Sequence, residues 1–428
     1  MTNLHILVQQ SYDTLLRHAQ NVKIILLHPK SRFRSLTVAK LLAESPRPVF
    51  YYSMGPYDVN VNSFLAGFAH DLANQHPTFG RHLYQLGIET NQVEYERLLE
   101  SMYYDLEELS DQPYFLVLDE FDASENADDV QEFLEDVLLN LPENCQVIIN
   151  SRTLPRLPWM GLVAQNQAVI LDDNELVGEN PYDYKVEKPE PIATLEVKGL
   201  GPGYISCNEN SVDEWEGHLP RLLLIFALER PQVTRAEICR AFWPNLDNDQ
   251  AVNVFHVTKR RLHKALGFDA LVHNEGYYQV NPQLKIRYDV SEFMTLLVRG
   301  RHASGEEAAQ AWQAAIDLYA GPFLQGHRED WIERQRQAYR AGYLEAILAI
   351  ARIRMESGRP ERALRILLQA SHEKESVEEI DREIMRIYAK LGRRSEAAAH
   401  YQSLVETLNN RELHPEEETQ LLYEELMA

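Results

Sequence analysis

Short apolar runs alternate with longer stretches of helical period over the first part of the chain. The runs are Lys23–Leu27 (KIILL), Val49–Tyr52 (VFYY), Tyr114–Leu118 (YFLVL) and Gln146–Ile149 (QVII). Continuous apolar strands separated by amphipathic helices are typical of a parallel sheet with helices on both faces. The pattern predicts an α/β domain, which we place at residues 1–177.

A second pattern follows a charged segment, Asp172–Ile192, which carries three prolines and no apolar period. Such a composition is typical of a linker, which we place at residues 178–191. Residues 192–297 then combine short strands with three helices and a terminal hairpin, which together predict a winged helix-turn-helix. The predicted elements are strands Thr194–Leu200 and Gly203–Ser206, an apolar helix at His218–Leu228, a capping box at Thr234–Glu237, a third helix ending at Gly267, and hairpin strands Leu271–His273 and Tyr277–Val280.

Long segments rich in Ala, Leu, Arg and Glu, with helical period, run from about Val298 to the end of the chain. Gly358–Ala363 and Gly392–Ala397 share one internal offset, and their glycines lie 34 residues apart. This is the tetratricopeptide period, in which small residues are expected to let the two helices of a repeat pack closely. We therefore predict an all-α domain of tetratricopeptide-like helical repeats at residues 298–428, with a terminal helix that begins near Pro415.

Composition narrows the class of protein. The chain has 428 residues, of which 45% are hydrophobic, so it is long enough for more than one core. It lacks both a long uninterrupted apolar run and a signal-peptide pattern, so we expect a cytoplasmic protein without a membrane partner. The three cysteines are scattered, which excludes a disulfide framework and a paired-cysteine metal site. A net charge of -23 argues against indiscriminate nucleic-acid binding, so any DNA contact must be local.

The third helix of the middle domain is a local exception to the acidic composition of the chain. From Ala251 to Gly267 the chain carries four Lys or Arg residues and no Asp or Glu. Spacings of three and four place Phe255, Thr258, Leu262 and Leu266 on one face, which we expect to pack on the core. Asn253, His256, Arg260 and His263 then face outward, with Lys259, Arg261 and Lys264 toward the flanks.

The chemistry of these side chains matches the two kinds of DNA contact. Arg binds guanine and Asn binds adenine through paired hydrogen bonds, whereas flanking cations neutralise phosphates. We assign Asn253, His256 and Arg260 to base contact, Lys259, Arg261 and Lys264 to phosphate contact, and His263 to one or the other. The alternative is an ordinary solvated basic face. Lys285 and Arg287 beyond the hairpin fit either a backbone contact or a plain place at the sheet edge.

The first predicted strand leads into His28–Thr37, where a phosphate-binding loop would open a helix. Arg34 and Ser35 occupy the places of the Lys and Ser/Thr of such a loop, but His28 and Phe33 replace its two glycines. Side chains at those points would obstruct the backbone N–H groups that cradle a phosphate. The prediction is therefore a degenerate P-loop-like domain with no catalytic residue and no cofactor, and ATP with magnesium is the alternative.

Residues 20–175 resemble the signal-transducing ATPases related to the maltose-regulon activator. The resemblance rests on VFYYSMGPYDVNVNSFLAGF, YFLVLDEFDASEN and NLPENCQVIINSRTLPRLP. It implies that Asp119 and Glu120 would hold magnesium and polarise water, and that Arg152 would sense the third phosphate. The missing glycines of the first loop depart from that family and favour a module retained for interaction or sensing over an active ATPase.

Residues 195–426 resemble the Streptomyces antibiotic regulatory protein family, which joins an OmpR-type winged helix to a bacterial transcriptional activator domain. The match rests on motifs in a fixed order, and His263 departs from it because the family usually has Arg there. The resemblance implies that the C-terminal domain dimerises the protein or contacts the transcription machinery. The motifs are RAEICRAFWP (235–244), KRRLHKALG (259–267), NEGYYQV (274–280), DVSEF (289–293), AIDLYAGPFL (315–324) and Trp331.

Three functional hypotheses follow. The first is a transcriptional regulator, expected to be an activator, with double-stranded DNA as one partner and RNA polymerase, another protein or a second copy of the chain as others. The second is an ATP-dependent signal-transducing regulator in which Arg34, Ser35, Asp119, Glu120 and Arg152 form a nucleotide site. The third is an interaction scaffold that does not bind DNA. No nucleophile or metal site is expected in any of them.

Overall fold

The computed structural model describes residues 3–87, 94–172, 175–176, 192–274, 276–371, 378–410 and 412–427. The predicted linker at 178–191 lies outside these residues. The chain divides into two compact units, one of residues 1–291 and 323–338, the other of residues 292–322 and 339–428.

The first part of unit one is a six-stranded sheet of order β2-β3-β4-β1-β5-β6. The four predicted apolar runs all form strands that pair in parallel, which confirms the parallel α/β region. A fifth parallel strand, Ala168–Asp172, was absent from the predicted set. The strands are β1 (Ile24–Leu27), β2 (Val49–Ser53), β3 (Tyr114–Asp119), β4 (Cys145–Asn150), β5 (Ala168–Asp172) and the antiparallel β6 (Glu175–Leu176).

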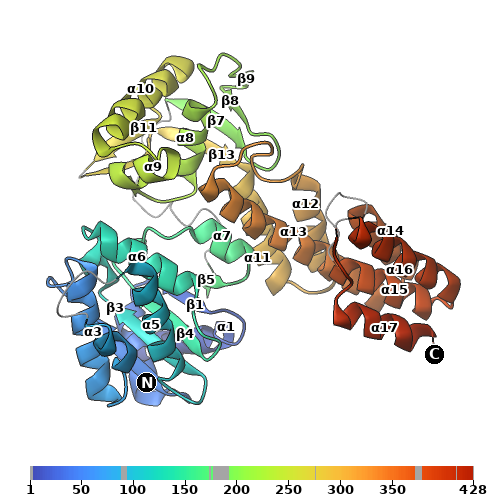
Figure 1. The fold of residues 1–428 in the computed structure, drawn as a ribbon, viewed down its shortest axis with the longest axis horizontal. Coiled ribbons are helices and arrows are strands. Elements are labelled where there is room, and N and C mark those ends of the chain that lie inside the picture. Colours follow the sequence, from blue (N-terminus) through green and yellow to red (C-terminus); the bar gives the residue numbers. More distant parts are fainter. Residues whose placement is uncertain are drawn as a thin grey trace. The chain divides into compact units, whose positions relative to one another are not determined.

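Helices cover both faces of this sheet (Figure 1). On one face, Tyr12 and Leu15 of the first helix and Val38 and Leu41 of the second pack on the strands in one apolar cluster. On the other, an aromatic cluster joins the second strand to the third and sixth helices. The helices are α1 (Asn3–His18), α2 (Arg34–Glu44), α3 (Val61–Gln75), α4 (Arg81–Gln85), α5 (Tyr95–Glu107), the 3₁₀ turn η1 (Phe121–Ser124), α6 (Asp128–Leu139) and α7 (Trp159–Ala164).

The second part of unit one contains the elements predicted between residues 192 and 297. A four-stranded sheet of order β13-β7-β8-β9 and a three-stranded sheet of order β10-β12-β11 accompany three helices. The strands are β7 (Ala193–Lys198), β8 (Tyr204–Cys207), β9 (Asn210–Ser211), β10 (Val233–Thr234), β11 (Leu271–Asn274), β12 (Tyr277–Val280) and β13 (Leu284–Tyr288). The helices are α8 (Leu219–Leu228), α9 (Arg235–Phe242) and α10 (Asn248–Leu266).

Residues 323–338 also belong to unit one, although they follow two helices of unit two in the sequence. The backbone N–H of Leu324 donates to the carbonyl of Gly199 at 2.9 Å, and Phe323 pairs with Leu200 as an isolated bridge. The Trp331 ring packs edge-on against Phe226 of α8, with 5.0 Å between ring centroids. The aromatic residues of this segment therefore complete the core of the middle region.

Unit two is helical. This agrees with the all-α region that the C-terminal pattern predicts (Figure 1). The helices are α11 (Asp289–His302), whose first three residues belong to unit one, α12 (Gly305–Leu318), α13 (Asp330–Glu356), which begins in unit one, α14 (Pro360–Ser371), α15 (Glu378–Lys390), α16 (Arg394–Asn409) and α17 (Glu417–Met427).

The two glycines of the predicted repeat take a different role from the one expected. Gly358 and Gly392 both have positive φ angles, 70° and 74°, and a Cβ added at either would meet no atom within 4 Å. The prediction that these glycines allow close helix packing is therefore wrong, because each is needed for the left-handed turn between two helices. Ala363 and Ala397 are fully buried, so the expectation of close packing holds for the alanines.

Candidate nucleic-acid interface

Helix α10 has well-defined ends. The Asp247 carboxylate accepts a hydrogen bond from the backbone N–H of Gln250 at 2.8 Å and so caps the first turn. At the other end Gly267, with φ 83°, donates its N–H to the carbonyl of His263 at 2.7 Å. The C-terminal cap predicted at Gly267 is confirmed.

One face of α10 is buried as the period predicts. Phe255, Thr258, Leu262 and Leu266 are all buried, together with Ala251 one turn earlier. The Phe255 ring packs edge-on against Tyr278 of β12, with 4.9 Å between the ring centroids. The Thr258 hydroxyl donates to the carbonyl of Val254, which satisfies this polar group inside the core. The helix is thus fixed in rotation against the hairpin.

The opposite face carries the three side chains assigned to base contact. Asn253, His256 and Arg260 are exposed, at spacings of three and four along the helix. Within the part of the chain that the structure describes, none of them has a hydrogen bond or ion pair, and the His256 ring lies 5.3 Å from the Phe255 ring, centroid to centroid. Their hydrogen-bonding groups are therefore open to solvent or to a ligand.

The flanking cations have acidic neighbours that lie outside the stretch Ala251–Gly267. Lys264 and Arg261 both pair with Glu216, and the Arg261 Nε lies 3.4 Å from that carboxylate. His263 Nδ1 lies 3.1 Å and Lys259 Nζ 4.0 Å from Asp269. The hydrogen bond with Lys264 lowers the pKa of Glu216, which keeps this carboxylate ionised.

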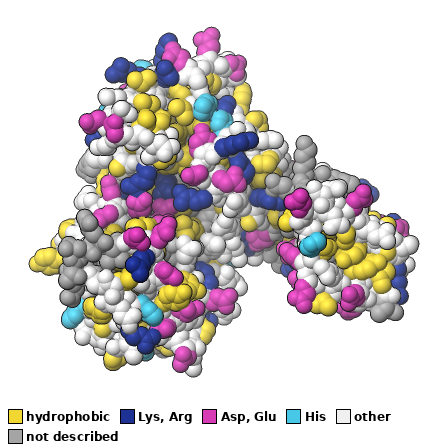
Figure 2. Space-filling view, viewed as in Figure 1, with side chains coloured by type: hydrophobic (Ala, Val, Ile, Leu, Met, Phe, Trp, Pro, Cys, Tyr) yellow, Lys and Arg dark blue, Asp and Glu magenta, His cyan; other side chains and the backbone are white. Residues whose placement is uncertain are grey.

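These pairs are exposed, so each is weak and is screened by salt. Figure 2 shows Lys and Arg side chains interspersed with Asp and Glu over the surface of the middle region, rather than a uniform basic patch. Phosphates would therefore compete with Glu216 and Asp269 for the flanking cations. Glu216 could not be found from the sequence because it is remote from the helix, whereas the position of Asp269 just past the helix end is a local signal.

The hairpin beside α10 pairs in a regular antiparallel register. Asn274 faces Tyr277 across the turn, and Leu271 faces Val280 at the far end. Gly276 in the turn has φ 93°, a conformation that favours glycine. Strand β10 pairs with β12 at Val233 and Thr234, so the hairpin is joined directly to the start of α9. Lys285 and Arg287 lie on β13, in the other sheet of this region.

The predicted nucleotide residues lie at the carboxyl edge of the parallel sheet, but only some of them come together. The Asn150 amide donates to Asp119 Oδ1 at 2.7 Å and to Ser35 Oγ at 3.5 Å, so it bridges the ends of β3 and α2. The Tyr51 hydroxyl donates to Asp119 Oδ2 at 2.7 Å. Burial, followed by this hydrogen bond, raises the pKa of Tyr51 to about 12. Asn150 and Tyr51 were absent from the predicted site.

The two arginines of the predicted nucleotide site are held elsewhere. Arg34 Nη1 donates to the carbonyls of Pro29 and Ser31, at 3.3 and 3.0 Å, within its own loop. Arg152 pairs with Glu120 at 3.0 Å and with Asp122 at 2.8 Å. Its hydrogen bond with Asp122 is the largest cause of its raised pKa. Neither guanidinium is directed to Asp119 or Ser35 by these contacts.

In the loop before α2, backbone N–H groups are already hydrogen-bonded to atoms of the loop itself. His28, at the place of the first missing glycine, is buried, and its Nδ1 accepts the backbone N–H of Lys30 at 3.1 Å. The N–H of Ser31 donates to the carbonyl of His28 at 2.8 Å. A phosphate-binding nest needs such N–H groups unpaired, so these bonds oppose phosphate binding in the conformation described.

A further group of polar residues lies between α8 and the segment before α13. The ligand atoms of His218, His327 and Glu329 all lie within 4.8 Å of one another. However, a guanidinium nitrogen of Arg221 lies 3.2 Å from His327 Nε2 and donates toward it. Burial is the main cause of the lowered pKa of His327. The negative charge of Glu329 opposes this effect, and the positive charge of Arg221 adds to it. Because a permanent cation already occupies the neighbourhood, we assign no metal to this group.

Family models match two regions of the chain. Residues 288–427 match the model described as bacterial transcriptional activator domain. The C-terminal region is therefore similar to a bacterial activator domain. This match supports a role in transcriptional activation and the C-terminal part of the resemblance to the Streptomyces antibiotic regulatory protein family. It covers less than half of the chain.

Residues 28–152 match the model described as Nephrocystin 3, N-terminal. This description does not identify the region as a P-loop ATPase. No curated protein matches the chain. Among the helices that the structure describes, none is both long and apolar enough to cross a bilayer.

Proposed function

We propose that the chain is a DNA-binding transcriptional regulator in which residues 192–297 form a winged helix-turn-helix. In this arrangement α9 and α10 are the two helices of the motif, α10 enters the major groove, and the β11–β12 hairpin is the wing. One observation carries the proposal. Asn253, His256 and Arg260 stand exposed on α10 with no polar partner among the described residues, while its opposite face is fixed on the hairpin through Phe255.

The roles of the side chains follow from their positions. Arg260 and Asn253 can form paired hydrogen bonds with guanine and adenine edges, and His256 lies between them on the same face. Lys259, Arg261 and Lys264 would exchange Glu216 and Asp269 for phosphates, and His263 would make a weaker contact than the Arg that the family usually has there. The activator-domain match supplies independent support for a role in transcription.

The other domains are assigned supporting roles. We propose that the helical repeats of unit two dimerise the chain or contact RNA polymerase, since stacked helix pairs present extended surfaces to protein partners. We propose that the α/β domain is an interaction or sensing module without ATPase activity. The bonds that close the His28 loop and occupy Arg34 and Arg152 favour this over the nucleotide-binding alternative.

The test of DNA binding is selection from a pool of random double-stranded DNA with the full chain. We expect enrichment of one sequence motif, because α10 offers three side chains to base edges. Recovery of unchanged random sequence after repeated rounds, or of no DNA, would contradict the proposal. The enriched duplex then serves as the probe in the experiments below.

A nucleotide titration decides between the two hypotheses for the α/β domain. We expect no saturable binding of ATP with magnesium to the wild-type chain at concentrations up to the millimolar range that cells maintain, because the Lys30 and Ser31 N–H groups are already paired. Isothermal titration calorimetry is the measurement, with Asp119→Ala as the comparison. Saturable binding that Asp119→Ala abolishes would establish the ATP-dependent alternative instead.

A further inference from the structure

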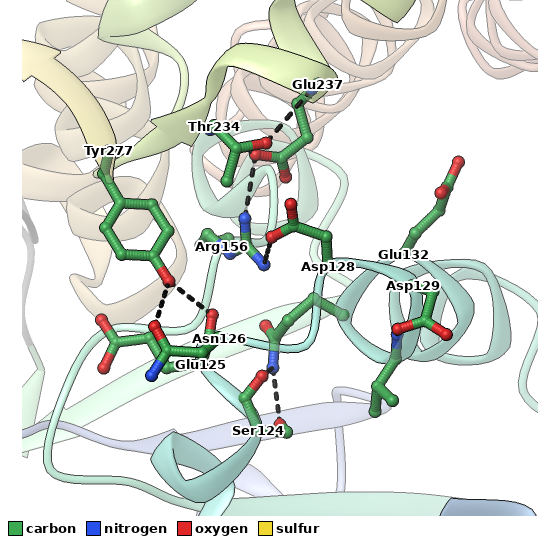
Figure 3. A network of polar contacts seen from close by, with 12 residues as sticks. Ser124, Glu125, Asn126, Asp128, Asp129, Glu132, Arg156, Thr234, Glu237 and Tyr277 are labelled. Atoms are coloured by element: carbon green, nitrogen blue, oxygen red, sulfur yellow. Dashed lines mark hydrogen bonds and ion pairs between the residues drawn. The ribbon is translucent and has the colours of Figure 1, made fainter. Parts of the chain in front are cut away.

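Arg156 of the α/β domain connects three elements of unit one (Figure 3). Its side chain is only 3% exposed. One guanidinium nitrogen pairs with Asp128 at the start of α6, at 2.9 Å, and another pairs with Glu237 of α9, at 3.0 Å. The same guanidinium lies over the Tyr277 ring, 5.4 Å from its centroid. A buried guanidinium thus joins the α/β domain to α9 and to the hairpin.

The hairpin has its own bonds to the α/β domain. The Tyr277 hydroxyl donates to the carbonyl of Glu125 at 2.7 Å and lies 3.1 Å from Asn126 Oδ1. Tyr277 is the first residue of β12 after the turn, so these contacts act close to the hairpin tip. Figure 3 shows the ring reaching down onto the segment that contains Glu125 and Asn126.

Helix α6 adds an acidic face to the same contact. Glu135 forms a two-pronged ion pair with Arg230, which follows α8, with both distances 2.9 Å. Glu132 pairs with Arg240 of α9. Arg230 also donates to the carbonyl of Arg156 at 2.9 Å, which links the two groups of contacts. Two cations of the middle region are therefore neutralised by α6.

This contact and DNA would compete for the same elements. In a winged helix-turn-helix the first motif helix crosses the DNA backbone, and here α9 and the hairpin tip are the parts held by the α/β domain. Asp128, Asp129, Glu132 and Glu135 would stand beside the phosphates and repel them. The base-reading face of α10 is left exposed, so the contact opposes DNA through the wing and the backbone.

We propose that this contact is an autoinhibitory latch. Its α/β side consists of residues 125–135 and Arg156, and the other side consists of α9 and the β11–β12 hairpin. The closed latch lowers DNA affinity, and its opening releases the wing and the cations Arg230 and Arg240. This inference rests on the proposed DNA-binding function. A latch of this kind shifts affinity by the fraction of molecules that are open, so weakening it raises apparent affinity without changing the selected sequence.

The experiment weakens the latch from the α/β side, so that no proposed DNA-contacting residue is altered. Glu132→Arg replaces the ion pair to Arg240 with repulsion, and Asn126→Ala removes one acceptor of Tyr277. The control is Asp13→Arg, which makes the same charge change at an exposed position of α1, on the opposite face of the sheet. The full chain is titrated against the selected duplex at fixed salt, by fluorescence anisotropy.

We expect Glu132→Arg to raise DNA affinity about tenfold and Asn126→Ala about threefold, while Asp13→Arg changes it less than twofold. Amide hydrogen exchange over 271–280 should accelerate in the first two variants and not in the control. If Glu132→Arg and the control have equal affinities, the contact is a constitutive part of the fold and the latch is refuted. If neither the wild type nor any variant binds DNA, the proposed function fails with it.

Discussion

The Arg260→Ala variant should bind the selected duplex about 5- to 150-fold more weakly than the wild type, a loss of about 1 to 3 kcal/mol. The reason is that Arg260 is proposed to form paired hydrogen bonds with one base, and alanine leaves that base edge without a partner. Because the side chain has no ion pair among the described residues, its removal should leave folding stability within about 0.5 kcal/mol. The loss of affinity can therefore be attributed to DNA contact.

The measurement is competition binding against duplexes changed at single positions. Arg260→Ala should relax preference at one position, whereas the control Lys259→Ala should weaken all sequences alike and reduce the salt slope by about one. Lys259 is adjacent on the same helix and lies 4.0 Å from Asp269, toward the flank. An Arg260→Ala protein with unchanged affinity and unchanged base preference would refute the assignment of this residue.

Phe255→Ala should destabilise the middle region by about 3 to 5 kcal/mol, because it removes a fully buried ring and leaves a cavity between α10 and β12. Phe255 is among the largest side chains that are completely buried, and its ring packs against Tyr278 of the hairpin. The variant should also lose DNA affinity, since α10 and the hairpin would no longer be held in one orientation.

Hydrogen exchange of the α8 and α10 amides is the appropriate readout, because a chain with several domains need not unfold in one transition. Val257→Ala is the matched control, since Val257 is 42% exposed on the same helix and should change stability by less than about 0.5 kcal/mol. Equal protection of these amides in Phe255→Ala and the control would show that α10 does not depend on this packing.

Local periodicity was sufficient to predict much of this structure. The buried face of α10 follows from the spacing of Phe255, Thr258, Leu262 and Leu266, because a helix places such residues on one side whatever surrounds it. The Thr234 capping box and the glycine cap at Gly267 were predicted for the same reason, since both depend on residues within one turn. The positions of the seven residues assigned to DNA were thus predictable, whereas the ion pairs of Arg261 and Lys264 with the remote Glu216 were not.

Features that join distant parts of the chain had no local signal. Strand β5 is a short apolar run that periodicity alone does not separate from a helix. The return of residues 323–338 to unit one, and the pairing of Arg156 with Glu237, depend on long-range packing. The same holds for Asn150, whose bridge between Asp119 and Ser35 requires three chain segments to meet at one sheet edge.

The central claim is that α10 reads a DNA sequence. It is tested most directly by titrating the wild-type chain with the selected duplex and with a scrambled duplex of the same composition, at one salt concentration. The proposal predicts that the selected duplex binds at least about 1,000-fold more tightly than the scrambled one. This factor is the lower end of the range by which specific affinity exceeds nonspecific affinity. Equal affinity for the two duplexes, or no binding to either, would contradict it.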